Sequence, residues 1–254
     1  MNLFDLTGRV AVVTGGNGGI GLGMARGLAG AGAALLIAGR NEKKNAAAVT
    51  ELRGLGARAE AIVADVTVET DCRSMVRTAT QKFGRLDILI NNAGTNIRKP
   101  AQDYSLAEWH AVLDTNLTSA YLCAQAAYPE MVRSGGGKII NIGSMLSIFG
   151  VSFAAAYAAS KGGIVQLSKA LATAWARDNI QVNAVLPGWI DTDLTRKARK
   201  QVPELHDRVL ARTPAGRWGL PDDHAGIAVF LAGKASDFVT GTAIPVDGGY
   251  SIQG

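Results

Sequence analysis

Short apolar runs alternate with longer segments of mixed polarity along the whole chain. Seven of these runs predict buried strands, at residues 10–13, 35–38, 61–64, 86–90, 138–142, 180–185 and 243–246. The runs are nearly continuous rather than alternating, which is typical of strands covered by helices on both faces of the sheet. The strand–helix–strand order therefore predicts an α/β fold with one doubly wound, seven-stranded parallel sheet.

A helix is predicted after the capping box that Ser105 and Glu108 form. Five residues then fall on one apolar helical face: Trp109, Val112, Leu113, Leu117 and Ala120. Asn116 falls on the same face. A buried amide without partners costs about 1–3 kcal/mol, so we expect Asn116 either to pair with structural partners or to serve in a proton relay.

The length of 254 residues and the hydrophobic share of 48% suit one large domain, 1–254. We find no internal repeat, low-complexity linker or second-domain boundary. The longest segment without strand character lies at about 190–215, and we expect it to carry short helices and to form a substrate lid.

Several classes of protein and site are not predicted. No run is long and apolar enough for a membrane span, and the first residues lack the order of a signal peptide, so the expected compartment is the cytoplasm. Cys72 and Cys123 form no C-x-x-C unit and are expected to be free buried thiols. The three histidines lack metal-ligand spacing, so no metal site is predicted.

The net charge is +5, which raises the question of an anionic partner. The basic residues are spread along the chain, apart from one cluster at residues 196–200, and no aromatic residues are interleaved with them. Nucleic-acid binding is therefore not expected. An anionic small molecule and a merely solvated surface both remain open as explanations.

A glycine-rich turn, Thr14-Gly15-Gly16-Asn17-Gly18-Gly19-Ile20-Gly21, directly follows the first predicted strand and precedes a helix that starts near Ile20. Glycines in this place let the backbone approach a pyrophosphate, whose charge then faces a helix N-terminus. The turn predicts a dinucleotide site.

The second strand ends at Gly39-Arg40-Asn41, where an acidic residue would bind the ribose hydroxyl of NAD. Because an arginine at this place suits a 2′-phosphate, we favour NADP over NAD. In the alternative interpretation, Arg40 only stacks on adenine and Glu42 serves the ribose.

Polar residues also follow the fourth and fifth strands, at Asn91-Asn92-Ala93-Gly94 and Gly143-Ser144. Ligands lie at the carboxyl ends of strands in open α/β sheets. A hydroxyl such as that of Ser144 could donate a hydrogen bond to the oxygen of a reacting carbonyl.

Tyr157 and Lys161 lie one helical turn apart, which places their side chains on one face of a helix. A neighbouring ammonium is expected to lower the pKa of the phenol below its usual value near 10. A tyrosine tuned in this way could exchange a proton with an alcohol or ketone.

Together these motifs resemble the short-chain dehydrogenase/reductase family over essentially the whole chain. The matching elements are residues 14–21, Asp65-Val66, 91–94, Asn116, Ser144, Tyr157-x-x-x-Lys161 and Pro187-Gly188. The resemblance implies a single-domain Rossmann fold, an NAD(P)-dependent oxidoreductase that interconverts a secondary alcohol and a ketone, and a homotetramer.

The resemblance also implies a role for each residue. Tyr157 would be the general acid/base, Lys161 would lower its pKa and bind the nicotinamide ribose, Ser144 would orient the substrate oxygen, and Asn116 would hold a relay water. The implied cofactor-binding set is Gly15, Asn17, Gly19, Ile20, Gly21, Arg40, Asp65, Val66, Asn92, Gly94, Tyr157, Lys161, Ile190 and Thr192. Within it, Asp65 and Val66 would contact adenine, Asn92 the adjoining ribose, and Ile190 and Thr192 the carboxamide.

Residues 95–100, 114–120 and 211–219 are similar to gluconate 5-dehydrogenases and 2-deoxy-gluconate 3-dehydrogenases. This similarity implies a sugar acid or polyol as the small-molecule substrate, and Arg98 with the basic lid could attract its carboxylate. The same motifs leave two alternatives: a 3-oxoacyl-thioester reductase, and a Rossmann protein that senses cofactor without turnover.

Overall fold

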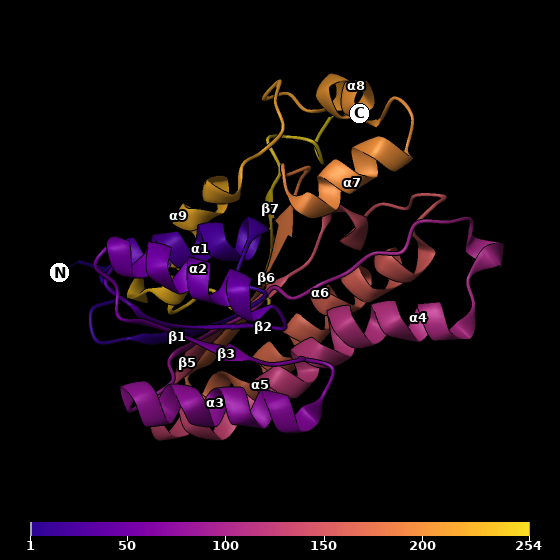
Figure 1. Cartoon of the computed structure of the whole chain (residues 1–254). Helices are drawn as coiled ribbons and strands as arrows, with labels where there is room; N and C mark the ends of the chain where they lie inside the picture. Colours follow the sequence, from indigo (N-terminus) through magenta and orange to yellow (C-terminus); the bar gives the residue numbers. More distant parts are fainter. Residues whose placement is uncertain (1, 254) are drawn as a thin grey trace.

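A parallel sheet forms the centre of the molecule in the computed structural model, which describes residues 2–253 (Figure 1). Its seven strands lie in the order β3-β2-β1-β4-β5-β6-β7. Their bounds are β1 Val10–Thr14, β2 Ala34–Gly39, β3 Ala59–Val63, β4 Ile88–Asn91, β5 Gly137–Ile142, β6 Ile180–Pro187 and β7 Ala243–Val246. All neighbouring strands pair in parallel, so the predicted seven-stranded doubly wound sheet is confirmed.

The third strand begins two residues earlier than its apolar run predicts. As β3 is an edge strand, only Ala59 within it is fully buried, and it accommodates Glu60 beside apolar residues. A strand at a sheet edge needs no continuous apolar sequence, because part of it faces solvent. The apolar run therefore located the strand but not its start.

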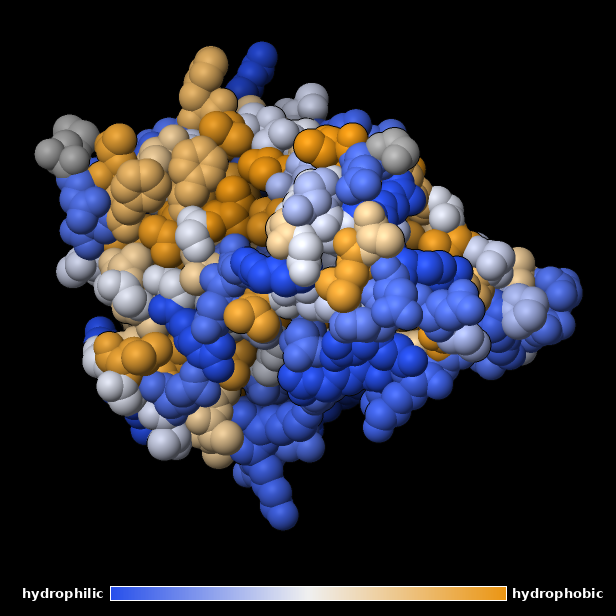
Figure 2. Space-filling model, turned by 90° about the horizontal axis from the view of Figure 1, so that it is seen from above, coloured by the Kyte–Doolittle hydropathy of each residue, from blue (hydrophilic) through white to orange (hydrophobic). Residues whose placement is uncertain are grey.

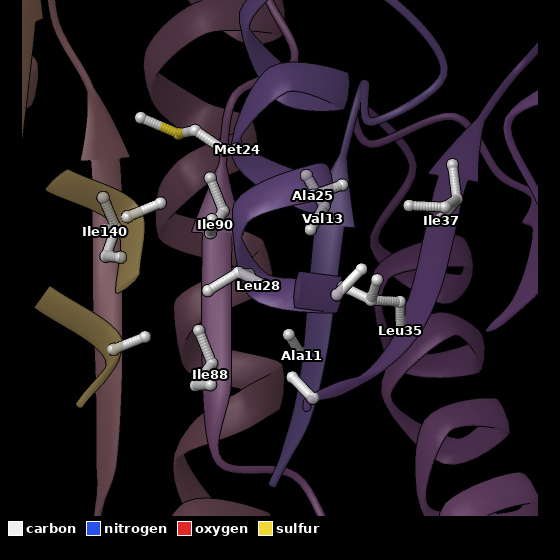
Figure 3. Packing of buried hydrophobic residues seen from close by; sticks show 14 of the residues in the cluster. Ala11, Val13, Met24, Ala25, Leu28, Leu35, Ile37, Ile88, Ile90 and Ile140 are labelled. Atoms are coloured by element: carbon white, nitrogen blue, oxygen red, sulfur yellow. The ribbon is translucent and has the colours of Figure 1, made fainter. Parts of the chain in front are cut away.

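Helices cover both faces of the sheet (Figure 1). They are α1 Gly19–Gly30, α2 Glu42–Gly54, α3 Glu69–Phe83, α4 Leu106–Leu113, α5 Ser119–Arg133, α6 Ala155–Trp175, α7 Asp193–Gln201, α8 Leu205–Arg212 and α9 Ala225–Ala232. On one face, Met24, Ala25 and Leu28 of α1 pack onto β1, β2, β4 and β5 (Figure 3). On the other, α3 and α5 pack against the alternate residues Val12 and Leu36. These two apolar layers hold the ends of the strands in fixed relative positions.

The predicted capping box is present at the start of α4. The Ser105 hydroxyl accepts a hydrogen bond from the Glu108 amide at 3.2 Å. The helical face predicted to continue from α4 is then interrupted by a π-helical turn, Asp114–Thr118, before α5 begins. The turn carries Asn116, which is 2% exposed; the expectation that this amide is buried is therefore confirmed.

The segment after β6 contains the two short helices α7 and α8, as expected for residues 190–215. They lie above the sheet, on the side to which its carboxyl ends point (Figure 1). Within residues 2–253, no helix combines the length and the apolar character that a membrane crossing requires.

Candidate active site

A cleft of about 470 Å³ lies at the carboxyl ends of the strands. The strand order reverses between β1 and β4, which is where open α/β sheets bind ligands. Nearly all the predicted site residues line this cleft: Gly15, Asn17, Gly19, Ile20, Arg40, Asp65, Val66, Asn92, Gly94, Ser144, Tyr157, Lys161, Ile190 and Thr192. Gly21 and Asn116 do not line the cleft, but they lie close to the lining residues Asn92 and Gly94.

The glycine-rich turn fits a pyrophosphate by its backbone. Gly15 and Gly19 have φ values of +61° and +52°, a conformation that favours glycine. A Cβ atom at Gly21 would lie 2.4 Å from Nδ2 of Asn92. No side chain caps the start of α1. The first amide groups of this helix can therefore bind an anion.

Thr14 and Asn92 tie this turn to β4. The Thr14 hydroxyl accepts hydrogen bonds from the amides of Asn92 and Ala93 at 3.0 and 3.1 Å. The Asn92 amide group donates to the carbonyls of Thr14 and Gly15, each at 3.0 Å. Asn92 therefore has a structural task here, while its predicted ribose contact stays a prediction. Thr14 was predicted only as the first residue of the motif; its contacts with Asn92 and Ala93 were not predicted, although a hydroxyl at the end of an apolar strand was a usable signal.

Asn45 also contributes to this end of the cleft, and its role was not predicted from the sequence. It is 2% exposed on α2 and accepts a hydrogen bond from Nδ2 of Asn17 at 2.6 Å. Its own Nδ2 donates to the carbonyls of Gly39 and Ile62 at 2.8 and 3.1 Å. Asn45 therefore joins the glycine-rich turn to the ends of β2 and β3. Asn45 lies at helical spacing from the apolar residues Ala48, Val49 and Leu52, which could have indicated that its amide is buried.

Arg40 and Asp65 face each other at the end of the cleft beyond β2. Nη1 of Arg40 lies 3.7 Å from Oδ2 of Asp65, and the arginine side chain is 72% exposed. The Thr67 backbone amide, followed by its hydroxyl and by Arg40, lowers the pKa of Asp65. Val66 is buried beside it. This end therefore offers an exposed cation, an ionised carboxylate and an apolar surface.

Tyr157 and Ser144 lie at the other end of the cleft, on α6 and in the loop after β5. Burial raises the pKa of Tyr157, while the Ser144 hydroxyl and the Arg98 guanidinium oppose this effect and lower it. The prediction of a net lowered pKa is therefore wrong for this geometry, because loss of solvent outweighs both favourable neighbours. Lys161 does not contribute to the shift.

Lys161 lies 5.7 Å from the Tyr157 ring centre, measured from Nζ, so the predicted common face is confirmed. Its ammonium is 4% exposed and donates to the carbonyl of Ile142 at 2.6 Å. Burial lowers the pKa of Lys161 to about 8. Desolvation thus disfavours the charged forms of both Tyr157 and Lys161. The ammonium of Lys161 bonds to the end of β5 at Ile142.

Asn116 is fully paired by structural partners. Its Oδ1 accepts from the Thr95 amide at 2.7 Å, and its Nδ2 donates to the Thr95 carbonyl and the Ser160 hydroxyl, each at 3.0 Å. A Cβ at Gly94 would lie 3.4 Å from this Oδ1 and 3.7 Å from Nζ of Lys161. The side chain therefore fixes the loop after β4 against α6, and the relay role stays a prediction.

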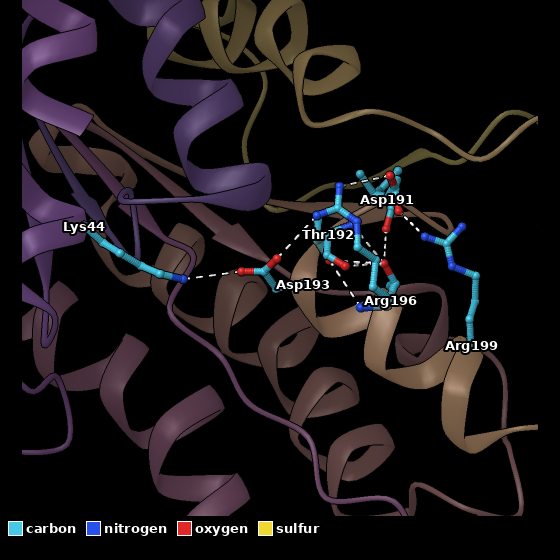
Figure 4. Close-up of polar contacts among 8 residues, drawn as sticks. Lys44, Asp191, Thr192, Asp193, Arg196 and Arg199 are labelled. Carbon is cyan, nitrogen blue, oxygen red and sulfur yellow. Dashed lines mark hydrogen bonds and ion pairs between the residues drawn. The ribbon is translucent and has the colours of Figure 1, made fainter. Parts of the chain in front are cut away.

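Residues 190–215, predicted to form a lid, begin at the cleft and are held together by ion pairs (Figure 4). Asp191 pairs with Arg196 and with Arg199, and these arginines lower the pKa of Asp191. Arg199 also lies over the Trp218 ring at 4.4 Å. Two cations of the basic cluster are thus paired within this segment, which weakens the expectation that the cluster itself attracts a substrate carboxylate.

Arg98 is better placed than the basic cluster at residues 196–200 to bind a substrate carboxylate. Its half-buried guanidinium bonds only to Oε1 of Gln201 and the carbonyl of Leu194 within residues 2–253, each at 3.3 Å. Burial lowers the pKa of Arg98, and Tyr157 acts in the opposite direction. A desolvated cation without a carboxylate partner favours an anionic ligand, and this one lies close enough to Tyr157 to influence its pKa.

Within the described residues, no group of three or more His, Cys, Asp or Glu side chains is arranged to hold a metal ion. Cys72 and Cys123 are both free and buried, as predicted.

A family model described as enoyl-(acyl carrier protein) reductase matches residues 15–251 of the chain. Among curated proteins, the chain is 41% identical to 2-dehydro-3-deoxy-D-gluconate 5-dehydrogenase of Escherichia coli (strain K12), over 98% of each chain.

Two solved structures are also similar. A gluconate 5-dehydrogenase from Burkholderia cenocepacia, in complex with NADP and tartrate, has a TM-score of 0.94 and 42% identity, covering 100% of this chain and 99% of the other. A short-chain type dehydrogenase/reductase from Mycobacterium marinum has a TM-score of 0.94 and 36% identity, covering 98% of each.

Proposed function

The chain belongs to the short-chain dehydrogenase/reductase family and is an NAD(P)-dependent oxidoreductase acting on CH–OH groups, and from this premise we propose the substrate and the roles of its residues. The proposed substrate is a sugar acid, whose hydroxyl and keto forms the enzyme interconverts. The observation that carries this proposal is the half-buried cation Arg98, whose charge acts on the pKa of Tyr157.

The proposed chemistry assigns one task to each residue at the inner end of the cleft. When bound, the nicotinamide cofactor supplies or accepts the hydride. Tyr157 gives or takes the proton at its phenol oxygen, and Ser144 donates a hydrogen bond to the substrate oxygen. Lys161 holds a positive charge in this buried place, because its pKa of about 8 keeps most of the ammonium protonated near neutrality.

The anionic end of the substrate is assigned to Arg98. A planar guanidinium binds a carboxylate with two parallel hydrogen bonds. Its present partners, Gln201 and a backbone carbonyl, are neutral and lie at 3.3 Å, so a carboxylate can displace them. The relatives named as sugar-acid dehydrogenases support this substrate class, because such substrates carry one carboxylate and several secondary hydroxyls.

A panel of sugar acids, neutral sugars and 3-oxoacyl esters, each assayed with both cofactors, tests this proposal. We expect Arg98→Met to raise KM for a sugar acid by roughly 10- to 100-fold, the value of a hydrogen bond to a charged group, and to leave neutral substrates nearly unaffected. Arg208→Met is the matched control, since Arg208 is exposed on α8. An equal effect on charged and neutral substrates would contradict the role of Arg98.

NADP is the proposed preferred cofactor, and Arg40 the residue that selects it. Its guanidinium is exposed at the end of β2 and only loosely paired with Asp65, so it can turn toward a 2′-phosphate. NADP in the complexes of relatives supports this preference. Arg40→Asp should shift the NADP/NAD ratio of kcat/KM toward NAD through repulsion of the phosphate. A constant ratio would leave adenine stacking as the role of Arg40.

The two alternative functions are less well supported. Relatives about 40% identical over the full chain are named as sugar-acid dehydrogenases, which disfavours a 3-oxoacyl-thioester reductase. A sensor without turnover would not need Tyr157, Ser144 and Lys161 together at one end of the cleft.

A homotetramer in the cytoplasm is the proposed working form. Apolar residues of α9 and β7 remain partly exposed although they adjoin the core, among them Phe230, Ile244 and Val246. Figure 2 shows apolar surface gathered on the left of its view, the side on which Figure 1 places α9. β7 is also an edge strand. Light scattering of the purified chain would test the assembly.

A further inference from the structure

The two cysteines of the chain meet in the core although 51 positions separate them. Cys72 lies in the first turn of α3 and Cys123 in the second turn of α5, two helices that pack side by side beneath the sheet (Figure 1). The two sulfur atoms are 3.5 Å apart, and each residue is 1% exposed. The chain has no other cysteine, so each thiol has one possible intrachain partner.

This pair is connected to the adenine end of the cleft. The Cys72 thiol donates to the carbonyl of Val66 at 3.3 Å. The neighbouring Asp71 carboxylate accepts a hydrogen bond from the Asp65 amide at 2.9 Å. Asp65 and Val66 both line the cleft. The first turn of α3 therefore holds this wall of the cleft through two hydrogen bonds.

We propose that Cys72 and Cys123 form an oxidation site, in which a small disulfide compound converts them to an intrachain disulfide that weakens dinucleotide binding. The Cys72 thiolate attacks one sulfur of the small disulfide, and one small thiolate leaves. The Cys123 thiolate then attacks the Cys72 sulfur of this mixed disulfide, forming the intrachain bond and releasing the second small thiolate. The two cysteine protons end on the two released thiols, so the protein is oxidised by two electrons and the small disulfide is reduced.

The environment of each thiol assigns these two roles. The hydrogen bond from Cys123 lowers the pKa of Cys72, and the first turn of a helix further favours a thiolate. The same contact and burial raise the pKa of Cys123 well above its usual value. Cys72 is therefore the attacking thiol, and Cys123 is the resolving thiol that reacts once the first bond has formed.

The disulfide affects the cleft because the sulfurs must move. A disulfide bond measures about 2 Å, so the two sulfurs must approach by about 1.5 Å from their present separation. The new bond also removes the S–H group that now donates to Val66. Both changes act on the helix turn that supports Asp65 and Val66, the wall proposed for adenine.

Binding and oxidation are coupled in both directions. Because the thiols are buried, an oxidant reaches Cys72 only when the first turn of α3 opens locally. A dinucleotide bound against Asp65 and Val66 opposes this opening. If the disulfide weakens cofactor binding by some factor, bound cofactor must disfavour the disulfide by the same factor.

The test uses the full chain, incubated in native buffer with glutathione disulfide, then quenched with acid and alkylated for intact-mass analysis. We expect loss of both alkylation sites in the wild type, with slower loss when NADP is present. The Kd for NADP, measured by fluorescence titration, should rise roughly fivefold or more and recover fully after treatment with dithiothreitol. Gel filtration and circular dichroism before and after oxidation separate a local effect from unfolding.

Cys123→Ser is the control variant, because it retains Cys72 but cannot close the intrachain bond. After the same treatment, its Kd for NADP should match that of the reduced wild type, and the intact mass shows whether a mixed disulfide is present. Cys72→Ser, whose hydroxyl can still donate to Val66, serves if the first variant does not fold. The proposal is overturned if both thiols remain free after oxidation, or if the disulfide forms and the Kd does not change. Because the readout is cofactor binding, a wrong substrate assignment would not affect the result.

Discussion

The end of the cleft proposed to bind the cofactor and the proposed lid above it, residues 190–215, are held together by different kinds of contact. At the cofactor end, backbone groups and buried amides make the contacts, such as the hydrogen bonds of Asn92 to Thr14 and Gly15. In the lid, Asp191 is joined to Arg196 and Arg199 by partly exposed ion pairs. The first region has no space for an added methyl group at Gly21, whereas the second can change its contacts at little cost.

This difference matches the tasks proposed for the two regions. A dinucleotide has a fixed shape, so a preorganised backbone binds it without a further loss of entropy. A lid must open and close, and surface ion pairs worth about 0–1 kcal/mol each are weak enough to exchange. The proposed reacting groups thus lie between a closely packed turn and a segment held by exchangeable ion pairs.

The largest expected effect comes from removing the Tyr157 hydroxyl, the proposed acid/base between the two regions. Tyr157→Phe should lower kcat by roughly 10²- to 10⁴-fold, the usual contribution of a general acid/base. Cofactor Kd should stay nearly unchanged, because neither the glycine turn nor the lid loses a contact. Steady-state kinetics and fluorescence titration measure the two quantities, and turnover close to that of the wild type would remove the mechanism.

A methyl group at Gly21 should disturb the closely packed glycine-rich turn. Its Cβ would lie 2.4 Å from Nδ2 of Asn92 and 2.7 Å from the carbonyl oxygen of Gly15. Overpacking of this kind costs about 1–3 kcal/mol, so we expect Gly21→Ala to raise the cofactor Kd by about 5- to 150-fold. Gly30→Ala at the other end of α1 is the control, since nothing lies within 4 Å of its added Cβ. If both variants bind cofactor equally well, the close approach at Gly21 is unimportant.

The smallest effect is expected in the lid. Asp191→Asn removes the charge that Arg196 and Arg199 share, while the helices α7 and α8 remain. Because these pairs are partly exposed, we expect KM for the substrate to change by about two- to fivefold and the cofactor Kd hardly at all. Asp207→Asn is the control, as Asp207 is exposed on α8. A loss of cofactor binding as large as that of Gly21→Ala would show that the lid is as rigid as the turn.

Parts of the site could be predicted from local sequence because local geometry dictates them. The glycine turn and the Tyr157–Lys161 spacing depend on backbone conformation and helix periodicity, and both are present as expected. The contacts of Asn45 and Thr14 escaped prediction because they join segments far apart in the chain, Asn45 with Asn17 and Thr14 with Asn92. The pKa of Tyr157 was predicted in the wrong direction, since spacing indicates which groups are near but not how much water the fold removes.

The sequence by itself determined the parallel sheet, the helices on both its faces and the position of the dinucleotide turn, because apolar runs, helical periodicity and glycine spacing act over a few residues. Only the tertiary structure decided which distant side chains meet: Asn17 with Asn45, Cys72 with Cys123, and Arg199 with Asp191. The physical reason is that these contacts follow from strand order and helix packing, which join segments far apart in the chain. Burial, which raises the pKa of Tyr157 and lowers that of Lys161, likewise exists only once those segments are assembled.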